Sequence, residues 1–391
     1  MSTEEDNGDM VVQPNPMQGV FVIPPLQPLN TEADMDLTFI RRVVTITLSV
    51  TMIIATGYIA AVILSDGAIL LRPSENALER HEIYRNLVNE PGEDLSGSGV
   101  TVCIVDSGIS TEHSDLDTMN LKSWKDFVND RDTPYDDHGH GTSMAGILVA
   151  NGWLKGVAPQ VNLLVAKALS KDGQGDDGVV AEAIDWCATN GAHIISLSLG
   201  GAPNVLPFSI TGGRTSGDAA NEAIDSGIYV IAAAGNDGGE DDDGDVASPS
   251  SEAGVISVGG VTHKGNSWAG SSEGDNNGRL VPLLFPRNDP HKKPEVVAPA
   301  QEVPILMTDG GWGLADGTSA ATVYVAGAIA LVLEAHPNLM TNGSQGNADD
   351  IDQMKNWLMN SVRPQQDQTG HDDRYGYGLL DIEALIAIVD S

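Results

Sequence analysis

The sequence predicts an α/β fold, in which a doubly wound, mostly parallel sheet carries helices on both faces and one transmembrane helix precedes it. Three observations lead to this prediction. Short apolar runs rich in β-branched residues alternate with helical stretches from about residue 99 onward, as in βαβ units. These runs are continuous rather than alternating, which is typical of strands buried on both faces. An uncharged stretch near the N-terminus is long enough to cross a bilayer.

The N-terminal region divides into three predicted parts. Residues 1–42 form an acidic, proline-containing tail that we expect to be disordered. Residues 43–65 carry no charge and would be about 34 Å long as a helix, against about 30 Å for the hydrocarbon core of a bilayer. We expect them to form a transmembrane helix. Residues 66–96 resemble a stalk or linker, with a short helical stretch around Ala77–Val88.

The charges that flank the apolar stretch predict its orientation. Arg41 and Arg42 precede it, and Asp66 follows it. The positive-inside rule then places the tail in the cytoplasm and the rest of the chain outside, as a single-pass membrane protein.

From about residue 97 to residue 391, strand and helix patterns alternate. The functional groups of such sheets gather at the carboxyl ends of the strands. Helices are predicted at Val179–Thr189 and Asp218–Ser226. The predicted strands are Val100–Val105, Val161–Ala168, His193–Leu199, Ile228–Ala234 and Val255–Val261.

Composition limits the possible partners. Apolar residues make up 41% of the 391 residues, which excludes wholesale disorder. With 55 acidic and 20 basic residues the net charge is −35, which disfavours nucleic acid as a partner. Such a charge is consistent either with a salty environment that screens it or simply with a soluble acidic surface. Cys103 and Cys187 are too few for a structural zinc site; they form either two buried thiols or a single bridge.

Four short motifs carry groups suited to catalysis. Asp106 ends the first predicted strand, and His140 opens a helix of small residues. Asn236 ends a later strand, and Ser319 opens an apolar helix that runs to about Ala335. Each motif alone is more often a turn or a helix cap. Their occurrence together, in this order, is not expected by chance.

The ordered set Asp, His-Gly-Thr, Ala-Ala-Gly-Asn and Gly-Thr-Ser resembles that of the subtilisin-like serine peptidases, from about Gly97 to the C-terminus. The resemblance implies a serine endopeptidase that acts on proteins or peptides, with its peptidase domain at residues 97–391. Ser319 would be the nucleophile, His140 its base, and Asp106 the group that orients the imidazole. The amide of Asn236 and the backbone N–H of Ser319 would form the oxyanion hole.

The same resemblance implies a cleft in which the substrate lies as a β-strand between two edges, at residues 198–200 and 173–175. Ala247 would lie at the floor of a side-chain pocket, and its small size leaves room for a large apolar side chain. The residues expected to bind substrate are Ser198, Leu199, Gly200, Gly173, Gly175, Asp237 and Ala247.

The chain also departs from the family's pattern. The segment Asn151–Lys155 is too short for the calcium loop that many members carry, since Ca²⁺ takes about six to eight oxygen ligands. We therefore expect no cofactor, although the acidic run Glu240–Asp243 leaves open a Ca²⁺ site of unknown position. His138 and His140 lack a third ligand at metal spacing, so no other metal is expected. Residues 66–96 are too few for an inhibitory propeptide domain, and none is evident.

A competing interpretation is a catalytically weak binding module of the same fold, tethered at a membrane. The intact Asp106, His140, Ser319 and Asn236 argue against it.

Overall fold

The structure is a computed structural model that describes residues 32–64, 72–92, 94–201, 213–239, 242, 244–275, 287–340 and 348–390. The chain divides into two units, Met1–Ile69 and Leu70–Ser391. Residues 1–31 of the predicted tail lie outside the described residues.

The first unit contains the helix α1, Glu32–Leu64, which begins well before the predicted span. Its segment Thr38–Ala61 is 24 residues long, apolar enough to cross a membrane, and unburied within the structure. Threonine hydroxyls along it donate to backbone carbonyls one turn earlier, at 2.7–2.9 Å. These side chains are thereby satisfied without water, as an apolar surrounding requires.

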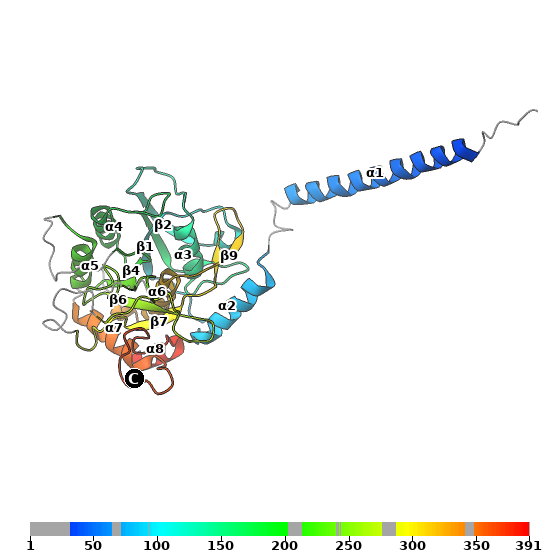
Figure 1. Cartoon of the computed structure of the whole chain (residues 1–391). Coiled ribbons are helices and arrows are strands. Elements are labelled where there is room, and N and C mark those ends of the chain that lie inside the picture. Colours follow the sequence, from blue (N-terminus) through cyan, green and yellow to red (C-terminus); the bar gives the residue numbers. More distant parts are fainter. Residues whose placement is uncertain are drawn as a thin grey trace, which may run out of the picture. The chain divides into compact units, whose positions relative to one another are not determined.

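The second unit contains a seven-stranded sheet in the order β2-β3-β1-β4-β5-β6-β7, in which all neighbours are parallel (Figure 1). This confirms the predicted fold class. The strand order reverses at β1, which places the carboxyl end of β1 where sheets of this kind bind ligands. The strands are β1 Thr101–Asp106, β2 Asn120–Asp126, β3 Asn162–Lys167, β4 Ile194–Leu197, β5 Tyr229–Ala233, β6 Ile256–Val261 and β7 Val296–Pro299.

Two of these strands were not predicted. The outermost strand β2 is partly exposed and carries lysines and polar residues, so it lacks an apolar run. The opposite edge, β7, has only four residues. A separate antiparallel hairpin consists of β8, Val303–Leu306, and β9, Trp312–Ala315.

Helices cover both faces of the sheet. On one face lie α3, His140–Val149, and α6, Thr318–Ala335; on the other lie α4, Asp177–Thr189, and α5, Ser216–Asp225. Near the C-terminus follow α7, Ala348–Ser361, and α8, Ile382–Val389. Although α6 is also long and apolar enough to span a membrane, 89% of it is buried in this unit, so it is a core helix.

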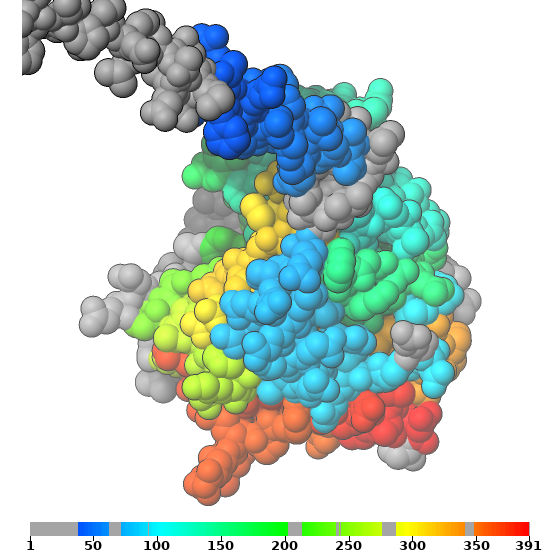
Figure 2. All heavy atoms as spheres, turned by 90° about the vertical axis from the view of Figure 1, so that its right-hand side faces the viewer, coloured from blue at the N-terminus to red at the C-terminus, as the bar shows by residue number. Residues whose placement is uncertain are grey.

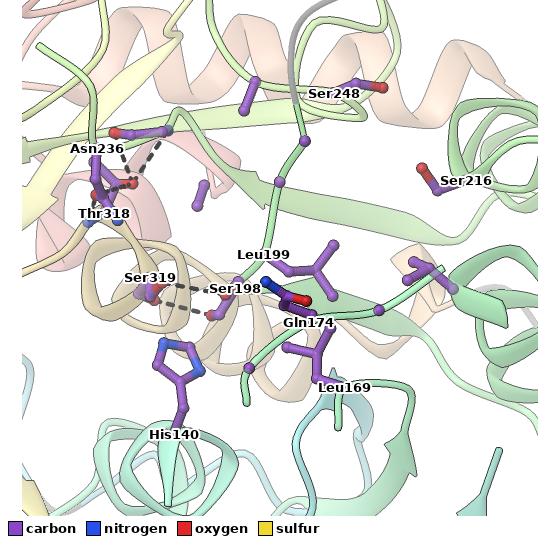
Figure 3. Close-up of a pocket in the computed structure, with 18 of the residues that line it drawn as sticks. His140, Leu169, Gln174, Ser198, Leu199, Ser216, Asn236, Ser248, Thr318 and Ser319 are labelled. Atoms are coloured by element: carbon purple, nitrogen blue, oxygen red, sulfur yellow. Dashed lines mark hydrogen bonds between the residues drawn. The ribbon is translucent and has the colours of Figure 1, made fainter. Parts of the chain in front are cut away.

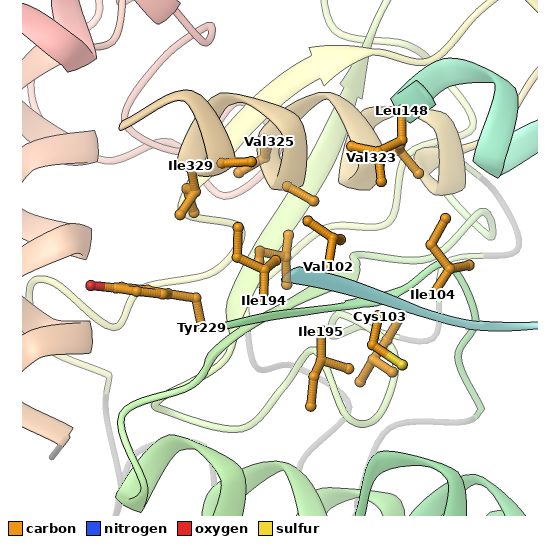
Figure 4. Packing of buried hydrophobic residues seen from close by; sticks show 14 of the residues in the cluster. Val102, Cys103, Ile104, Leu148, Ile194, Ile195, Tyr229, Val323, Val325 and Ile329 are labelled. Carbon is orange, nitrogen blue, oxygen red and sulfur yellow. The ribbon is translucent and has the colours of Figure 1, made fainter. Parts of the chain in front are cut away.

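The strand β1 shows how the core is divided between the two faces of the sheet. Val102 and Ile104 point toward α6, whereas Cys103 points to the opposite face (Figure 4). There Cys103 forms a disulfide with Cys187 of α4, and neither residue is exposed. Of the two alternatives for the cysteines, the structure therefore has the bridge.

The helix α2, Glu75–Leu87, lies where the sequence predicted a short helical stretch, but it packs on the second unit and is not a free stalk. Ala77, Tyr84 and Val88 are buried, and Tyr84 and Val88 belong to the core of the second unit. Residues 77, 84 and 88 share one helical face, which is why this stretch packs on the body instead of extending as a linker.

Candidate active site

The first pair of groups lies where β1 meets α3. Asp106 is the last residue of β1 and is fully buried. Its two carboxylate oxygens lie 2.8 and 2.9 Å from Nδ1 of His140, the first residue of α3. Because a carboxylate can only accept, Nδ1 carries the proton and Nε2 is left as an acceptor. The negative charge of Asp106 outweighs burial and raises the pKa of His140 above its usual value.

The start of α3 is held by Asp136, four residues before His140 in the sequence. Its carboxylate accepts hydrogen bonds from the backbone N–H groups of Gly139 and Thr142, both at 2.8 Å, and from the hydroxyl of Ser107 at 2.9 Å. Burial opposes the charge, but these bonds and one from the Thr142 hydroxyl lower the pKa of Asp136 below its usual value. The charged carboxylate thus caps α3 and fixes its first residue, His140.

Glycine at position 141 allows the closest approach in this region. A Cβ added there would lie 2.1 Å from the carbonyl oxygen of Gly108, in the turn that follows β1. Only glycine lets α3 come this near to the end of β1, so that the imidazole reaches Asp106.

Ser319 is the second residue of α6 and is nearly buried. Its hydroxyl donates to the carbonyl oxygen of Ser198 at 3.1 Å, and the Ser198 hydroxyl donates back to the carbonyl oxygen of Ser319 at 3.0 Å. Figure 3 shows the ring of His140 directed toward this pair of serines. The structure therefore brings Ser319 and His140 to the same place. The Ser319 hydroxyl is hydrogen-bonded to Ser198, the residue that follows β4, and not to the imidazole.

The side-chain amide of Asn236 has a defined orientation. Its Oδ1 accepts hydrogen bonds from the backbone N–H of Thr318 at 2.9 Å and from the Thr318 hydroxyl at 3.0 Å (Figure 3). Both donors act on the oxygen, so the NH₂ group points away from them and stays available. Sequence reasoning missed Thr318, although its position between Gly317 and Ser319 was a signal.

A cleft of about 840 Å³ runs along these groups. His140, Asn236 and Ser319 line it, and so do all seven residues expected to bind substrate. The two expected edges thus face one cleft. Gly173 adopts a φ of +72°, and a Cβ there would lie 2.8 Å from Nε2 of His138, which also lines the cleft. The glycine keeps that edge open.

A second pocket of about 300 Å³, which sequence reasoning missed, shares His140 and Ser319 with the cleft. Its other lining residues come from the β8–β9 hairpin, from Asp316 and Gly317 after it, from residues 138 and 139, and from the first turns of α3 and α6. Its apolar lining consists of Met144, Ile305, Met307, Ala315 and Ala320.

Lys167, at the carboxyl end of β3, is a second residue that sequence reasoning missed. Its side chain is fully buried, and its Nζ donates to the carboxylate of Asp137 at 2.7 Å and to the carbonyl oxygens of Ser107 and Leu169 at 2.5 and 2.9 Å. It therefore ties the turn after β1 to β3. A lysine at the end of an otherwise apolar run was the signal.

No group of three or more His, Cys, Asp or Glu side chains in the described parts of the chain is arranged to hold a metal ion. The buried carboxylate of Asp115 accepts from the backbone N–H of Leu154 and from Nε1 of Trp312, both at 2.9 Å, so the short loop 151–155 itself supplies a donor. Of the acidic run considered for Ca²⁺, residues 240, 241 and 243 lie outside the described residues, and the adjacent Asp245 pairs with Arg287 at 2.6 Å.

Comparisons with known proteins identify the family of the chain. The profile of the Subtilase family matches residues 97–378. Subtilisin E of Bacillus subtilis (strain 168) is 31% identical over 300 residues, which cover 75% of this chain and 67% of that protein. The subtilisin of Bacillus pumilus is also 31% identical over 300 residues, covering 75% of this chain and 92% of the relative.

A solved structure shows the same architecture. The crystal structure of a cold-adapted subtilisin-like serine proteinase aligns with a TM-score of 0.56 at 26% identity, covering 74% of this chain and 90% of that one. With most of the chain matched by the family profile and with these relatives, the protein belongs to the subtilase family and is a serine-type endopeptidase.

Proposed function

We propose that this endopeptidase hydrolyses protein or peptide substrates with Asp106, His140 and Ser319 as its catalytic triad, while α1 anchors it in a membrane. The observation that carries the proposal is the buried Asp106 carboxylate on Nδ1 of His140, with Ser319 opposite the ring at the start of α6. This pairing leaves Nε2 free to accept a proton from the hydroxyl that attacks.

In the proposed reaction the Ser319 hydroxyl gives up its hydrogen bond to the carbonyl oxygen of Ser198 and donates to His140 instead. Nε2 of His140 takes the hydroxyl proton as Oγ attacks the scissile carbonyl, and then gives it to the nitrogen of the departing amine. Asp106 stabilises the imidazolium that exists between these two transfers, in agreement with the raised pKa of His140. Water then repeats the sequence on the acyl-enzyme.

The developing oxyanion is bound by the NH₂ group of Asn236 and the backbone N–H of Ser319. The support for Asn236 is that Thr318 holds its Oδ1, which leaves the amide hydrogens to be donated. Ser319 lies in the first turn of α6, where backbone N–H groups have no partner within the helix. Both donors are in place before reaction, so little reorganisation is needed when charge develops.

The acyl side of the substrate occupies the 840 Å³ cleft as a strand between residues 198–200 and residues 173–175. Asp237 and Ala247 line the same cleft, as the proposed side-chain pocket before the scissile bond requires. Because His140 and Ser319 are shared with the second pocket, the departing side of the substrate lies in that pocket.

The membrane anchor is proposed as a single pass with the tail cytoplasmic and the peptidase domain outside. The segment Thr38–Ala61 has the length and composition for it, and Arg41 and Arg42 lie toward its N-terminal side. The Cys103–Cys187 disulfide supports the outward location, because such bridges persist in oxidising compartments and are rare in the cytosol.

The test uses the full chain in detergent and a fluorophosphonate probe that labels reactive serines. We expect Ser319→Ala to lose labelling and to lower turnover by several orders of magnitude, because triad members act as a unit. Ser216→Ala is the matched control, since Ser216 lines the same cleft and should leave labelling intact. Labelling retained by Ser319→Ala would refute Ser319 as the nucleophile. A wild type that binds peptides without cleaving them would instead support the binding-module interpretation.

The anchor is tested separately by alkaline carbonate extraction of membranes. The full chain should remain in the pellet, and a variant lacking residues 38–61 should appear in the supernatant. A full chain that is released by carbonate would refute the transmembrane role of α1.

A further inference from the structure

We propose that α2 is a positioning element for catalysis, which holds Asp316 and Gly317, just before Thr318 and Ser319, through the turn Gln301–Glu302. This inference rests on the proposed role of Ser319 as the nucleophile. It assigns a catalytic contribution to the segment that the sequence suggested was a stalk.

The helix α2 lies on the second unit by one face. Ala77, His81, Tyr84 and Val88 are buried, and their spacing places them along one side of the helix. Figure 2 shows α2 in light blue on the surface, between the yellow segment of β8 and β9 and the red C-terminal residues. Its C-terminal end is fixed by the backbone, where the N–H of Ile382 donates to the carbonyl oxygen of Val88 at 2.9 Å.

Two side chains of α2 reach the turn between β7 and β8. The Tyr84 hydroxyl donates to the carbonyl oxygen of Gln301, and Arg80 forms an ion pair with Glu302 at 2.6 Å. Glu302 has a φ of +51°, a left-handed conformation that a non-glycine residue adopts at a cost and keeps only where its surroundings hold it. α2 supplies part of that support.

The same turn contacts the residues that precede the nucleophile. The backbone N–H of Glu302 donates to the carboxylate of Asp316 at 2.6 Å, and the N–H of Gly317 donates to the carbonyl oxygen of Ala300 at 2.7 Å. Asp316 and Gly317 lead directly into Thr318 and Ser319. Two hydrogen bonds therefore join the turn held by α2 to the start of α6.

The consequence concerns the transition state more than substrate affinity. Asp316 and Gly317 line the second pocket, whereas the 840 Å³ cleft that takes the acyl side has no lining residue from α2 or from residues 300–302. A shifted turn would move Ser319 and its N–H relative to His140 and Asn236. Small misplacements of reacting groups cost much more in rate than in binding.

The experiment measures the rate of fluorophosphonate labelling of the full chain in detergent, together with kcat and KM on a peptide, well below the unfolding temperature of each variant. We expect the double variant Tyr84→Phe/Arg80→Ala to label about tenfold more slowly and to lose a similar factor in kcat, with KM within about twofold. Tyr84→Phe/Arg80→Lys, which keeps the charge at position 80, should label faster than Tyr84→Phe/Arg80→Ala and so restore part of the lost rate. Glu302→Ala should add little to Arg80→Ala, because both remove the same ion pair.

Two control variants separate positioning from stability. Glu79→Ala changes an exposed residue of α2, and Val88→Ala removes core packing at the far end of the same helix. Val88→Ala should lower the unfolding temperature and leave the labelling rate within about twofold. Equal labelling rates for the wild type and the Tyr84→Phe/Arg80→Ala variant would overturn the proposal, and so would an equal loss in Val88→Ala. The proposed function fails on a different result, namely wild-type labelling that does not occur at Ser319.

Discussion

The bridge between Cys103 and Cys187 allows a prediction whose size follows from the structure. It joins β1, which ends in Asp106, to α4, across 84 residues of sequence. A crosslink stabilises a protein mainly by removing conformations from the unfolded chain, and the effect grows with the logarithm of the loop. For a loop of this length the chain-entropy relation predicts about 4.6 kcal/mol at 25 °C.

The same figure can be expressed as a change in the unfolding temperature. The second unit, Leu70–Ser391, has an unfolding entropy of about 0.7 kcal/mol/K, from about 2.1 cal/mol/K for each residue. Loss of the bridge should therefore lower the unfolding temperature by about 7 °C. We expect Cys103→Ala and Cys187→Ala each to show this loss. The double variant should lie within about 1 kcal/mol of either one, because the bridge can be lost only once.

The assay is thermal and guanidinium unfolding of the full chain in detergent, on a Ser319→Ala background that prevents self-digestion of unfolded molecules. Thiol alkylation of the unfolded, unreduced chain provides the control and should find no free thiol. Single variants that cost about 1 kcal/mol each, with effects that add in the double variant, would refute the reasoning. That result would show two buried thiols and would remove a support for the outward location of the domain.

Three further predictions concern the site and the charge of the chain. Asn236→Ala should lower kcat by about 10²–10³, the size of this effect in subtilisin itself, and leave KM nearly unchanged; a loss of stability with normal kcat would contradict the oxyanion role. Because Asp106 raises the pKa of His140, the rise of kcat/KM that reports the neutral base should have its midpoint above pH 6.5. The stabilisation of the fold by the His140–Asp106 pair is complete below pH 6.5 and is lost as the pH rises through the pKa of His140 in the folded protein. An acid limb of the pH–rate profile with its midpoint at or below pH 6.5 would contradict the raised pKa. At a net charge of −35 the unfolding temperature should rise between 0.01 M and 1 M NaCl, as the screening length falls from about 30 to about 3 Å; calorimetry showing a flat or falling curve would contradict it.

Much of the fold could be predicted because buried parallel strands appear in the sequence as short, nearly continuous apolar runs. The runs at β1, β3, β4, β5 and β6 are mostly apolar, since both faces of each strand are covered. The edge strand β2 lacks this pattern, whereas the edge strand β7 is apolar and buried but short. An edge strand with an exposed face needs no continuous apolar run. The four residues of β7 directly follow Lys293, Pro294 and Glu295, so they do not belong to a longer apolar run as those of β4 do.

The candidate site was predictable for a related reason. Asp106 and Asn236 follow apolar strands, and His140 and Ser319 open helices of small or apolar residues. Residues that act at the carboxyl edge of a parallel sheet therefore stand directly after strands or at the starts of helices, and these positions can be recognised in the sequence. The groups that hold them, such as Thr318 on Asn236 and Asp136 on α3, depend on hydrogen bonds whose geometry no local pattern specifies.

By itself, the sequence determined the α/β class, the places of the central strands, the order of the four site residues and the apolar character of α1, because each of these is a property of neighbouring residues. Only the tertiary structure decided that Cys103 meets Cys187, that α2 packs on the turn at Glu302, and that a second pocket shares His140 and Ser319. These features join segments 84 to more than 200 residues apart. Such contacts arise from the packing of whole elements against one another, so they cannot be predicted from periodicity or from local motifs.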